Sequence, residues 1–108
     1  MPEVLVKFDE PMRDADGAMY FAQAAGQQRD DGLWEGWLEF MGLDESARSI
    51  CSDRETTQPN RADLEYWAQG LTRVYLQGAL ARAGSCAEPA QRESAQREPA
   101  ARESSRNA

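Results

Sequence analysis

The sequence predicts an α+β domain: an antiparallel β-meander of three or four strands, then one kinked or two short C-terminal helices packed on one face. Apolar residues alternate with a period of two in the first half of the chain, which is typical of half-buried strands. In the second half they recur at intervals of three and four, which indicates a helix. A small, partly closed barrel with the helix plugging one end is the alternative.

The first two strands are expected near the N-terminus. Residues 4–8 form the first, with three apolar side chains on one face: Val4, Val6 and Phe8. Residues 14–17 combine Asp and Gly in the manner of a turn. Residues 18–25 are the expected second strand, although their alanines equally permit a helix. The polar residues 26–32 are expected to form a loop.

The clearest strand is residues 33–40, whose side chains alternate between two faces. One face is apolar: Trp34, Gly36, Leu38 and Phe40. The other face mixes apolar side chains with two carboxylates: Leu33, Glu35, Trp37 and Glu39. A glycine inside a strand often marks a bulge or a close backbone approach, which we expect at Gly36. A weaker fourth strand is expected over residues 47–53 and contains Ile50.

A helical segment, residues 61–83, follows an extended connector at residues 56–59. Asn60 is the expected N-cap, because its side chain can accept a hydrogen bond from a free backbone N–H group. One helical face is formed by small or apolar residues: Leu64, Trp67, Ala68, Leu71, Val74, Tyr75 and Gly78. Gly70 is unfavourable inside a helix. Either one helix has a weak point there, or the first helix ends and Thr72 caps a second.

The chain changes character after Gly84. All 25 side chains of Leu, Ile, Val, Phe, Met, Trp and Tyr lie in residues 1–84. Charged residues then recur every five positions: Glu88, Glu93, Glu98, Glu103, Arg92, Arg97 and Arg102. A period of five builds no helical stripe, and a segment with nothing to bury does not offset its ordering entropy. We expect one folded domain, 1–84, and a disordered low-complexity tail, 85–108, with folding on a partner as the alternative.

The charge balance argues against several classes of protein. The chain carries 12 basic and 19 acidic side chains, a formal charge of −7, and no histidine. Nucleic acids are bound by a surplus of Lys and Arg, so we expect no nucleic-acid partner. Without histidine, the commonest general base and metal ligand are missing, and no known catalytic motif occurs. We therefore expect no enzymatic activity, no cofactor and no metal site.

Cysteine usage and hydropathy bear on the location of the protein. Cys51 and Cys86 lie far apart, and no Cys-x-x-Cys motif occurs. We expect two free thiols in a reducing cytosol, with a Cys51–Cys86 disulfide as the alternative. The first residues do not read as a signal peptide, and no stretch approaches the roughly 20 apolar residues of a membrane span. A cytoplasmic location without membrane contact is the expectation.

Three strings in the sequence are distinctive: residues 31–40 (DGLWEGWLEF), 54–63 (RETTQPNRAD) and 66–68 (YWA). Together they resemble a family of small bacterial proteins that form a domain of unknown function. The resemblance covers residues 4–83, so the tail lies outside it. It implies a bacterial origin and supplies no mechanism.

The charged face of the third strand is the first candidate site. Trp37 lies between Glu35 and Glu39 on that face. An exposed aromatic ring between carboxylates can hold a basic peptide or a cationic ligand through cation–π and charge contacts. The alternative is structural: Trp37 is covered by a helix edge or a loop, while Trp34 joins the core.

The start of the helix is the second candidate site. Polar side chains converge there on free backbone N–H groups and on the positive end of the helix dipole, which together bind anions. Alternatively, this segment only caps the helix, and its arginines pair with carboxylates of the sheet. Across both sites the candidate binding residues are Trp34, Trp37, Arg54, Glu55, Asn60, Arg61 and Trp67.

Two functions fit these observations. The first is a small acidic, non-enzymatic protein-interaction or regulatory module, which binds a protein partner or a second copy of itself. The second is a small-molecule or anion-binding protein that uses the helix N-terminus and the Trp-rich strand. A pocket at the helix start favours the second function, and an exposed sheet edge or apolar patch favours the first.

Overall fold

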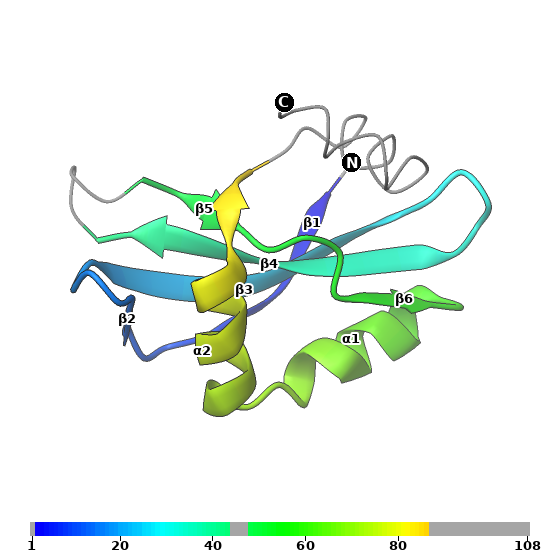
Figure 1. Ribbon diagram of the computed structural model, residues 1–108. Coiled ribbons are helices and arrows are strands. Elements are labelled where there is room, and N and C mark those ends of the chain that lie inside the picture. Colours follow the sequence, from blue (N-terminus) through cyan, green and yellow to red (C-terminus); the bar gives the residue numbers. More distant parts are fainter. Residues whose placement is uncertain (1, 44–47, 87–108) are drawn as a thin grey trace, which may run out of the picture.

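The computed structural model describes residues 2–43 and 48–86 and confirms the α+β class. Within these ranges, seven strands form one antiparallel sheet, and two helices follow six of them (Figure 1). The elements are β1 (Glu3–Lys7), β2 (Met12–Arg13), β3 (Met19–Gln28), β4 (Trp34–Gly42), β5 (Ile50–Cys51), β6 (Thr56–Gln58), α1 (Arg61–Gln69), α2 (Arg73–Arg82) and β7 (Gly84–Ser85).

The β3–β4 hairpin forms the centre of the sheet. Its register runs from Tyr20 opposite Gly42 to Gln28 opposite Trp34. Strands β1 and β2 both pair with β3, and strands β5 and β6 both pair with β4. β1 and β2 thus act as one interrupted strand beside β3, and β5 and β6 act as another beside β4. The predicted antiparallel meander of three or four strands is confirmed in this form.

The hairpin is longer than the sequence predicted. Residues 18–25 are strand rather than helix, but pairing continues to Gln28, so the expected loop over residues 26–32 was wrong for its first half. The turn is tight because Arg29 N–H donates to the carbonyl of Leu33 at 2.7 Å, and Gly32 adopts a φ of 89°. A positive φ of this size favours glycine, which has no Cβ to clash.

A β-bulge in β1 separates side chains that the sequence placed on one face. Val4 stands opposite Ala25 and Val6 opposite Ala24, so Leu5 is the additional residue. Val6 and Phe8 pack against the core, but Val4 is 44% exposed. The prediction was wrong for Val4 because the two-residue period does not continue through a bulge.

Both helices lie on the same side of the sheet, which we name the inner face (Figure 1). The alanines of β3 stand opposite the large side chains of β4 there, for example Ala24 opposite Leu38 and Ala22 opposite Phe40. Small residues facing large ones leave room for the helices to approach. The buried core cluster consists of Met12, Tyr20, Ala22, Ala24, Leu38, Phe40, Ala68, Leu76, Ala79 and Leu80.

Two glycines of the hairpin allow α1 to pack closely against the sheet. Gly26 and Gly36 stand opposite each other in the hairpin. A Cβ atom on Gly36 would lie 2.8 Å from Leu64 Cδ1 and 2.8 Å from Trp67 Cζ3, which is closer than real Cβ atoms approach. The close backbone approach predicted at Gly36 is confirmed, and α1 is the element that approaches.

The helical segment is two helices rather than one kinked helix. Asn60 caps α1, since its Oδ1 accepts from the backbone N–H of Asp63 at 2.8 Å. Thr72 caps α2, since its Oγ1 accepts from the backbone N–H of Tyr75 at 3.2 Å. Gly70 ends α1, and its N–H donates back to the carbonyls of the last turn. The sequence contained both capping signals but left the two readings open.

A disulfide joins Cys51 and Cys86, with their Cα atoms 4.8 Å apart. The expectation of two free thiols was therefore wrong. The cause is the pairing of β5 with β7, in which Cys51 stands opposite Gly84 and Cys86 follows two residues later. Two-residue strands leave no periodic signal, so nothing in the sequence pattern indicates that the two cysteines are neighbours.

Two predictions fall wholly or partly beyond these ranges. The expected fourth strand over residues 47–53 is reduced to β5, and residues 44–47 lie outside the described chain. Almost all of the predicted disordered tail, residues 87–108, lies outside it as well. Neither of the two described helices is long and apolar enough to cross a membrane.

Candidate functional site

The candidate site is the face of the hairpin that lies away from the helices, which we name the outer face. It carries two hydrogen-bonded carboxylates and a buried tryptophan. Side chains alternate between the faces of a sheet, and directly opposed residues share a face. The hairpin register therefore assembles four cross-strand pairs on the outer face: Phe21 with Met41, Gln23 with Glu39, Ala25 with Trp37, and Gln27 with Glu35.

Two of these pairs join an amide to a carboxylate. Gln23 Nε2 donates to Glu39 Oε1 at 2.8 Å, and Gln27 Nε2 donates to Glu35 Oε2 at 2.8 Å. A hydrogen bond to a charged acceptor is stronger than one between neutral groups. The two pairs hold both carboxylates in fixed orientations.

Trp37 lies between the two amide–carboxylate pairs. Its indole Nε1–H donates to Glu39 Oε2 at 3.0 Å, and its ring stands opposite the small side chain of Ala25. The side chain is 2% exposed, so it is not the open aromatic platform that the sequence suggested. Its burial agrees with the structural alternative, in which a helix edge or a loop covers Trp37, and of these two no described helix packs on this face (Figure 1).

Glu35 is the least expected residue of the outer face. It is 0% exposed, and its Oε1 has no hydrogen-bond partner, while Oε2 accepts only from Gln27 among the described contacts. Burying an ionised carboxylate without a compensating partner is costly, so buried charges are normally paired. Glu35 Oε1 is therefore a buried carboxylate oxygen without a hydrogen-bond partner, which is uncommon in folded proteins.

An open hollow continues the outer face beyond the Gln23–Glu39 pair. Its volume is about 490 Å³, which exceeds the lower limit of typical ligand pockets. The hollow is lined by Lys7, Phe8, Asp9, Phe21, Ala22, Gln23 and Met41. Exposed Phe21 and half-buried Met41 give its floor an apolar character. Apolar contacts and a fixed carboxylate thus lie next to each other along one hairpin.

The disulfide lies on the outer face as well. Cys51 in β5 stands directly opposite Glu39 in β4, and opposed residues share a face. Cys86 is bonded to Cys51, so the described chain ends on the outer face, one strand away from Glu39.

The predicted second site at the helix start is not assembled as expected. Asn60 is occupied as the helix cap, and the Arg61 guanidinium binds Glu3 at 2.9 and 3.0 Å and Glu65 at 3.5 Å. Glu3 in turn holds the pKa of Arg61 above its ordinary value, chiefly through the hydrogen bond. Trp67 packs over Gly36 on the inner face, across the sheet from Trp37. Trp34 is half-buried, also on the inner side.

Glu55 belongs to a third location. It accepts hydrogen bonds from the Tyr75 hydroxyl and from the Arg82 guanidinium at 3.1 Å, and so ties α2 to the segment before β6. Burial and the Glu55 carboxylate raise the pKa of Tyr75 to about 12. Arg54 is exposed beside this cluster in the sequence. The seven candidate residues are thus divided among the outer face, the inner face, the helix start and the contacts around Glu55.

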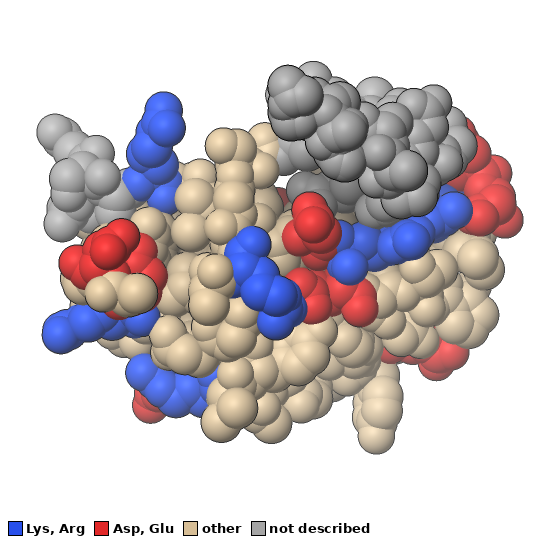
Figure 2. Space-filling model, in the orientation of Figure 1, with Lys and Arg blue, Asp and Glu red and all other residues tan. Residues whose placement is uncertain are grey.

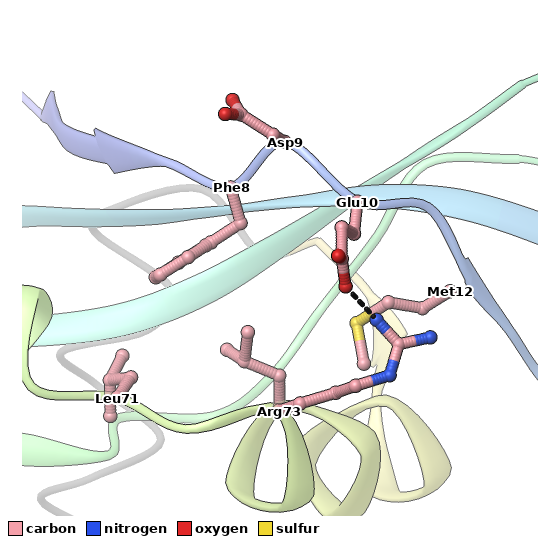
Figure 3. A pocket seen from close by; sticks show the side chains of 7 residues that line it. Phe8, Asp9, Glu10, Met12, Leu71 and Arg73 are labelled. Carbon is pink, nitrogen blue, oxygen red and sulfur yellow. Dashed lines mark hydrogen bonds and ion pairs between the residues drawn. The ribbon is translucent and has the colours of Figure 1, made fainter.

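A second, smaller pocket lies at the junction of the helices (Figure 3). It has a volume of about 210 Å³ and is lined by Phe8, Asp9, Glu10, Met12, Leu71, Arg73 and Leu76. An ion pair between Arg73 and Glu10, 2.9 Å long, crosses its rim, and the Asp9 carboxylate points away from it (Figure 3). Its only cation is thereby neutralised, so the pocket offers mainly apolar contacts.

Charges on the rest of the surface are mixed. On the face shown in Figure 2, basic and acidic side chains of the described residues lie next to one another over the tan, uncharged surface. Five ion pairs join described residues: Arg29–Asp31, Arg61–Glu3, Arg61–Glu65, Arg73–Glu10 and Arg82–Glu55. Within the described ranges, no cluster of three or more acidic or cysteine side chains is placed to hold a metal ion.

Comparison with known proteins adds no candidate, since no family model, no curated protein and no solved structure matches this chain. The resemblance to a bacterial family stays a prediction.

Sequence reasoning missed Gln23 and Gln27, the partners of the two glutamates. A signal was available, because a tight turn centred on Asp31 places residues 23 and 39, and residues 27 and 35, opposite each other.

Proposed function

We propose that this protein is a non-enzymatic interaction module that binds a basic polypeptide segment on the outer face of its sheet. The observation that carries the proposal is Glu35, whose carboxylate is buried while its Oε1 has no hydrogen-bond partner. A cationic donor would satisfy that oxygen. The guanidinium of arginine suits it best, because its planar fork of N–H groups matches a carboxylate.

The spacing of the carboxylates favours a polypeptide over a small cation. Glu35 and Glu39 are four residues apart on one strand, which corresponds to about 13 Å. One guanidinium cannot contact both carboxylates over that distance. Two basic side chains on one extended segment can, and the adjoining hollow accommodates further side chains of the same ligand.

The alternative function, anion binding at the helix start, receives less support. Arg61 is held by Glu3 and Glu65, and Asn60 is used as the cap. An anion would have to displace these carboxylates from Arg61. On the outer face the Glu35 oxygen has no partner to be displaced, but the side chain is 0% exposed, so a ligand reaches it only when the atoms that cover it move.

The location of the protein belongs to the same proposal. Disulfides persist mainly in oxidising compartments and are rare in the cytosol. The Cys51–Cys86 bond therefore favours an oxidising compartment over the cytoplasmic location predicted from the sequence. Trapping free thiols with an alkylating reagent in intact cells, followed by mass spectrometry of the protein, distinguishes the two locations.

The proposal is tested by calorimetric titration of the full chain with a blocked peptide, Arg-Ser-Gly-Ser-Arg, whose arginines have the same four-residue spacing as the two glutamates. We expect Glu35→Gln to weaken binding by tenfold or more, since hydrogen bonds to charged groups contribute about 1.5–3 kcal/mol. Glu39→Gln should weaken it less, because both Glu39 oxygens already accept hydrogen bonds. Added salt should weaken binding in all variants.

The matched control is Asp16→Asn, which removes the same charge from an exposed turn between β2 and β3. The same peptide with citrulline in place of arginine controls for the guanidinium charge. Equal weakening by Asp16→Asn and Glu35→Gln would mean that only net charge is sensed and would reject the site. Circular dichroism melting of each variant shows that the chain is folded during the titration.

A further inference from the structure

We propose that the pocket at the junction of the helices binds a free amino acid with a branched aliphatic side chain, represented here by L-leucine (Figure 3). The pocket contains none of the glutamates and glutamines that pair across the outer face, so this inference is independent of the proposed function. It rests on the apolar walls of the pocket and on the two opposite charges at its rim.

The walls of the pocket are apolar and come from segments far apart in the sequence. Met12 and Leu76 are 2% and 5% exposed and belong to the buried core, so they form a fixed floor. Phe8 and Leu71 are half-buried, and the Phe8 ring points toward Leu71 (Figure 3). The volume of about 210 Å³ lies below the roughly 300–1,000 Å³ of pockets for drug-sized ligands. The pocket therefore suits one small apolar side chain better than a large cofactor.

The rim of the pocket has hydrogen-bond acceptors on one side and donors on the other. The connection between β1 and β2 supplies two acceptors, the Glu10 carboxylate and the Pro11 carbonyl. Arg73 at the start of α2 donates to Glu10 at 2.9 Å and to Pro11 at 3.4 Å. The first backbone N–H groups of a helix have no partner inside it, and the positive end of the helix dipole lies there as well. A ligand carboxylate is thus attracted to the start of α2, and a ligand ammonium group to the β1–β2 connection.

An amino acid carries both of these charges next to one apolar side chain. A carboxylate alone would take Arg73 from Glu10 and leave Glu10 without its cation. An amine alone would leave Arg73 without its anion. A zwitterion inserted between the two side chains gives each of them a new partner of the right charge, and it leaves the net charge of the pocket unchanged.

The ion pair across the rim is suited to opening. The side chains of Arg73 and Glu10 are 57% and 80% exposed, and ion pairs with such exposure contribute little to stability because water solvates the separated charges. The Asp9 carboxylate points away from the pocket, so Glu10 is the carboxylate that meets the ligand (Figure 3). Displacement of water from the apolar walls supplies the favourable free energy of binding.

The test follows the backbone amide resonances of the full chain by NMR during titration with L-leucine and with three molecules that each lack one part of it. Isocaproate lacks the ammonium group, isoamylamine lacks the carboxylate, and glycine lacks the side chain. We expect L-leucine to shift the amide signals of Leu71, Arg73 and Val74 at the start of α2. Each of the other molecules should bind about tenfold more weakly or less, because each loses either a charged contact or the apolar burial.

Matched variants separate this site from general effects of charge. Arg73→Gln and Glu10→Gln should each weaken L-leucine binding by about tenfold or more. Arg13→Gln removes the same charge from an exposed position of β2 outside the pocket, so it should leave binding unchanged. Leu71→Trp fills the pocket while both rim charges stay, and it should abolish binding. Circular dichroism melting of each variant shows that the chain is folded during the titration.

Three outcomes would overturn the proposal. Unmoved amide signals at the start of α2 with L-leucine would reject the site. Equal binding of L-leucine and isocaproate would reject the zwitterion, since a carboxylate would then suffice. Equal weakening by Arg73→Gln and Arg13→Gln would show that only net charge is sensed. None of these results bears on peptide binding by the outer face, which is measured separately with Glu35→Gln.

Discussion

The inner and outer faces of the β3–β4 hairpin are built from alternate residues of the same two strands, yet different forces hold them together. On the inner face, small residues of β3 stand opposite large apolar residues of β4, and helices cover both. On the outer face, glutamines of β3 hold glutamates of β4 through hydrogen bonds, and a disulfide lies at the edge.

The two faces therefore differ in the kind of interaction that dominates them. Apolar burial is non-directional and stabilises the fold in proportion to area. Hydrogen-bonded carboxylates contribute less to folding, and an unsatisfied one opposes it, but they define which ligand fits. The inner face therefore accounts for the fold, while the outer face, through Glu35, accounts for the proposed interaction.

The first prediction concerns the truncation of one side chain on each face, which should have very different effects on stability. Phe40 is completely buried on the inner face, so Phe40→Ala should lower the free energy of unfolding by about 3–5 kcal/mol. Its neighbour Met41 is half-buried on the outer face, so Met41→Ala should cost only about 1 kcal/mol. Urea denaturation measures both. Equal losses would show that the two faces contribute alike to stability.

The second prediction concerns the covalent link on the outer face. The disulfide spans 35 residues of sequence, and loop-closure entropy for that length corresponds to about 3–4 kcal/mol of stability. Adding a reductant should lower the free energy of unfolding of the wild type, measured by urea denaturation, by that amount, and the urea midpoint falls with it. The Cys51→Ala, Cys86→Ala double variant should start from the lower midpoint and show no response to reductant. A reductant effect in the double variant would exclude the disulfide as its cause.

The third prediction tests the close packing of α1 on the inner face. Because a Cβ on Gly36 would lie 2.8 Å from Leu64 Cδ1 and Trp67 Cζ3, Gly36→Ala should overpack the interface and cost about 1–3 kcal/mol. Gly84→Ala is the matched control, because no atom lies within 4 Å of its added Cβ. The control should change stability by less than about 0.5 kcal/mol. Similar losses in both variants would reject the packing explanation.

How far the sequence predicts this molecule depends on whether a feature is local. The faces of β4, the cap at Asn60 and the close approach at Gly36 follow from periods and residue types within a few positions, and all three are confirmed. The bulge at Leu5 is also local, but it interrupts the period that would reveal it. Prediction from the sequence therefore succeeds where the pattern is regular and fails where it is interrupted.

The candidate site depends on pairings that are not local. The sequence suggested Glu35, Trp37 and Glu39, because they alternate on one strand. It could not show that Gln27 would satisfy one oxygen of Glu35 and leave the other unpaired, since that requires the register of the hairpin. The disulfide required the pairing of two distant two-residue strands, which no local pattern encodes.

The fourth prediction concerns the pH dependence of stability and involves the smallest change in free energy. It depends on a hydrogen bond at the rim of the inner face, between the Tyr75 hydroxyl and Glu55. Tyr75 donates its hydroxyl hydrogen bond to Glu55, and its pKa is raised from 10.0 to about 12. Below pH 10 the hydroxyl is protonated in both folded and unfolded chains, so the contact contributes fully. Between pH 10 and 12 only the unfolded chain loses the proton, so the contribution falls as pH rises and is lost above about pH 12.

Melting temperatures of the wild type and of Tyr75→Phe, measured from pH 8 to 12, isolate this contribution, because the other tyrosines ionise in both chains. We expect a small, constant advantage of the wild type up to about pH 10 and a progressive loss of that advantage above it. Tyr75 is partly exposed, so solvent screens the contact and the advantage stays well below that of Phe40. No advantage of the wild type at any pH would mean that the ring, which Tyr75→Phe keeps, rather than the hydroxyl holds α2 in place, and an advantage unchanged to pH 12 would contradict the raised pKa of Tyr75.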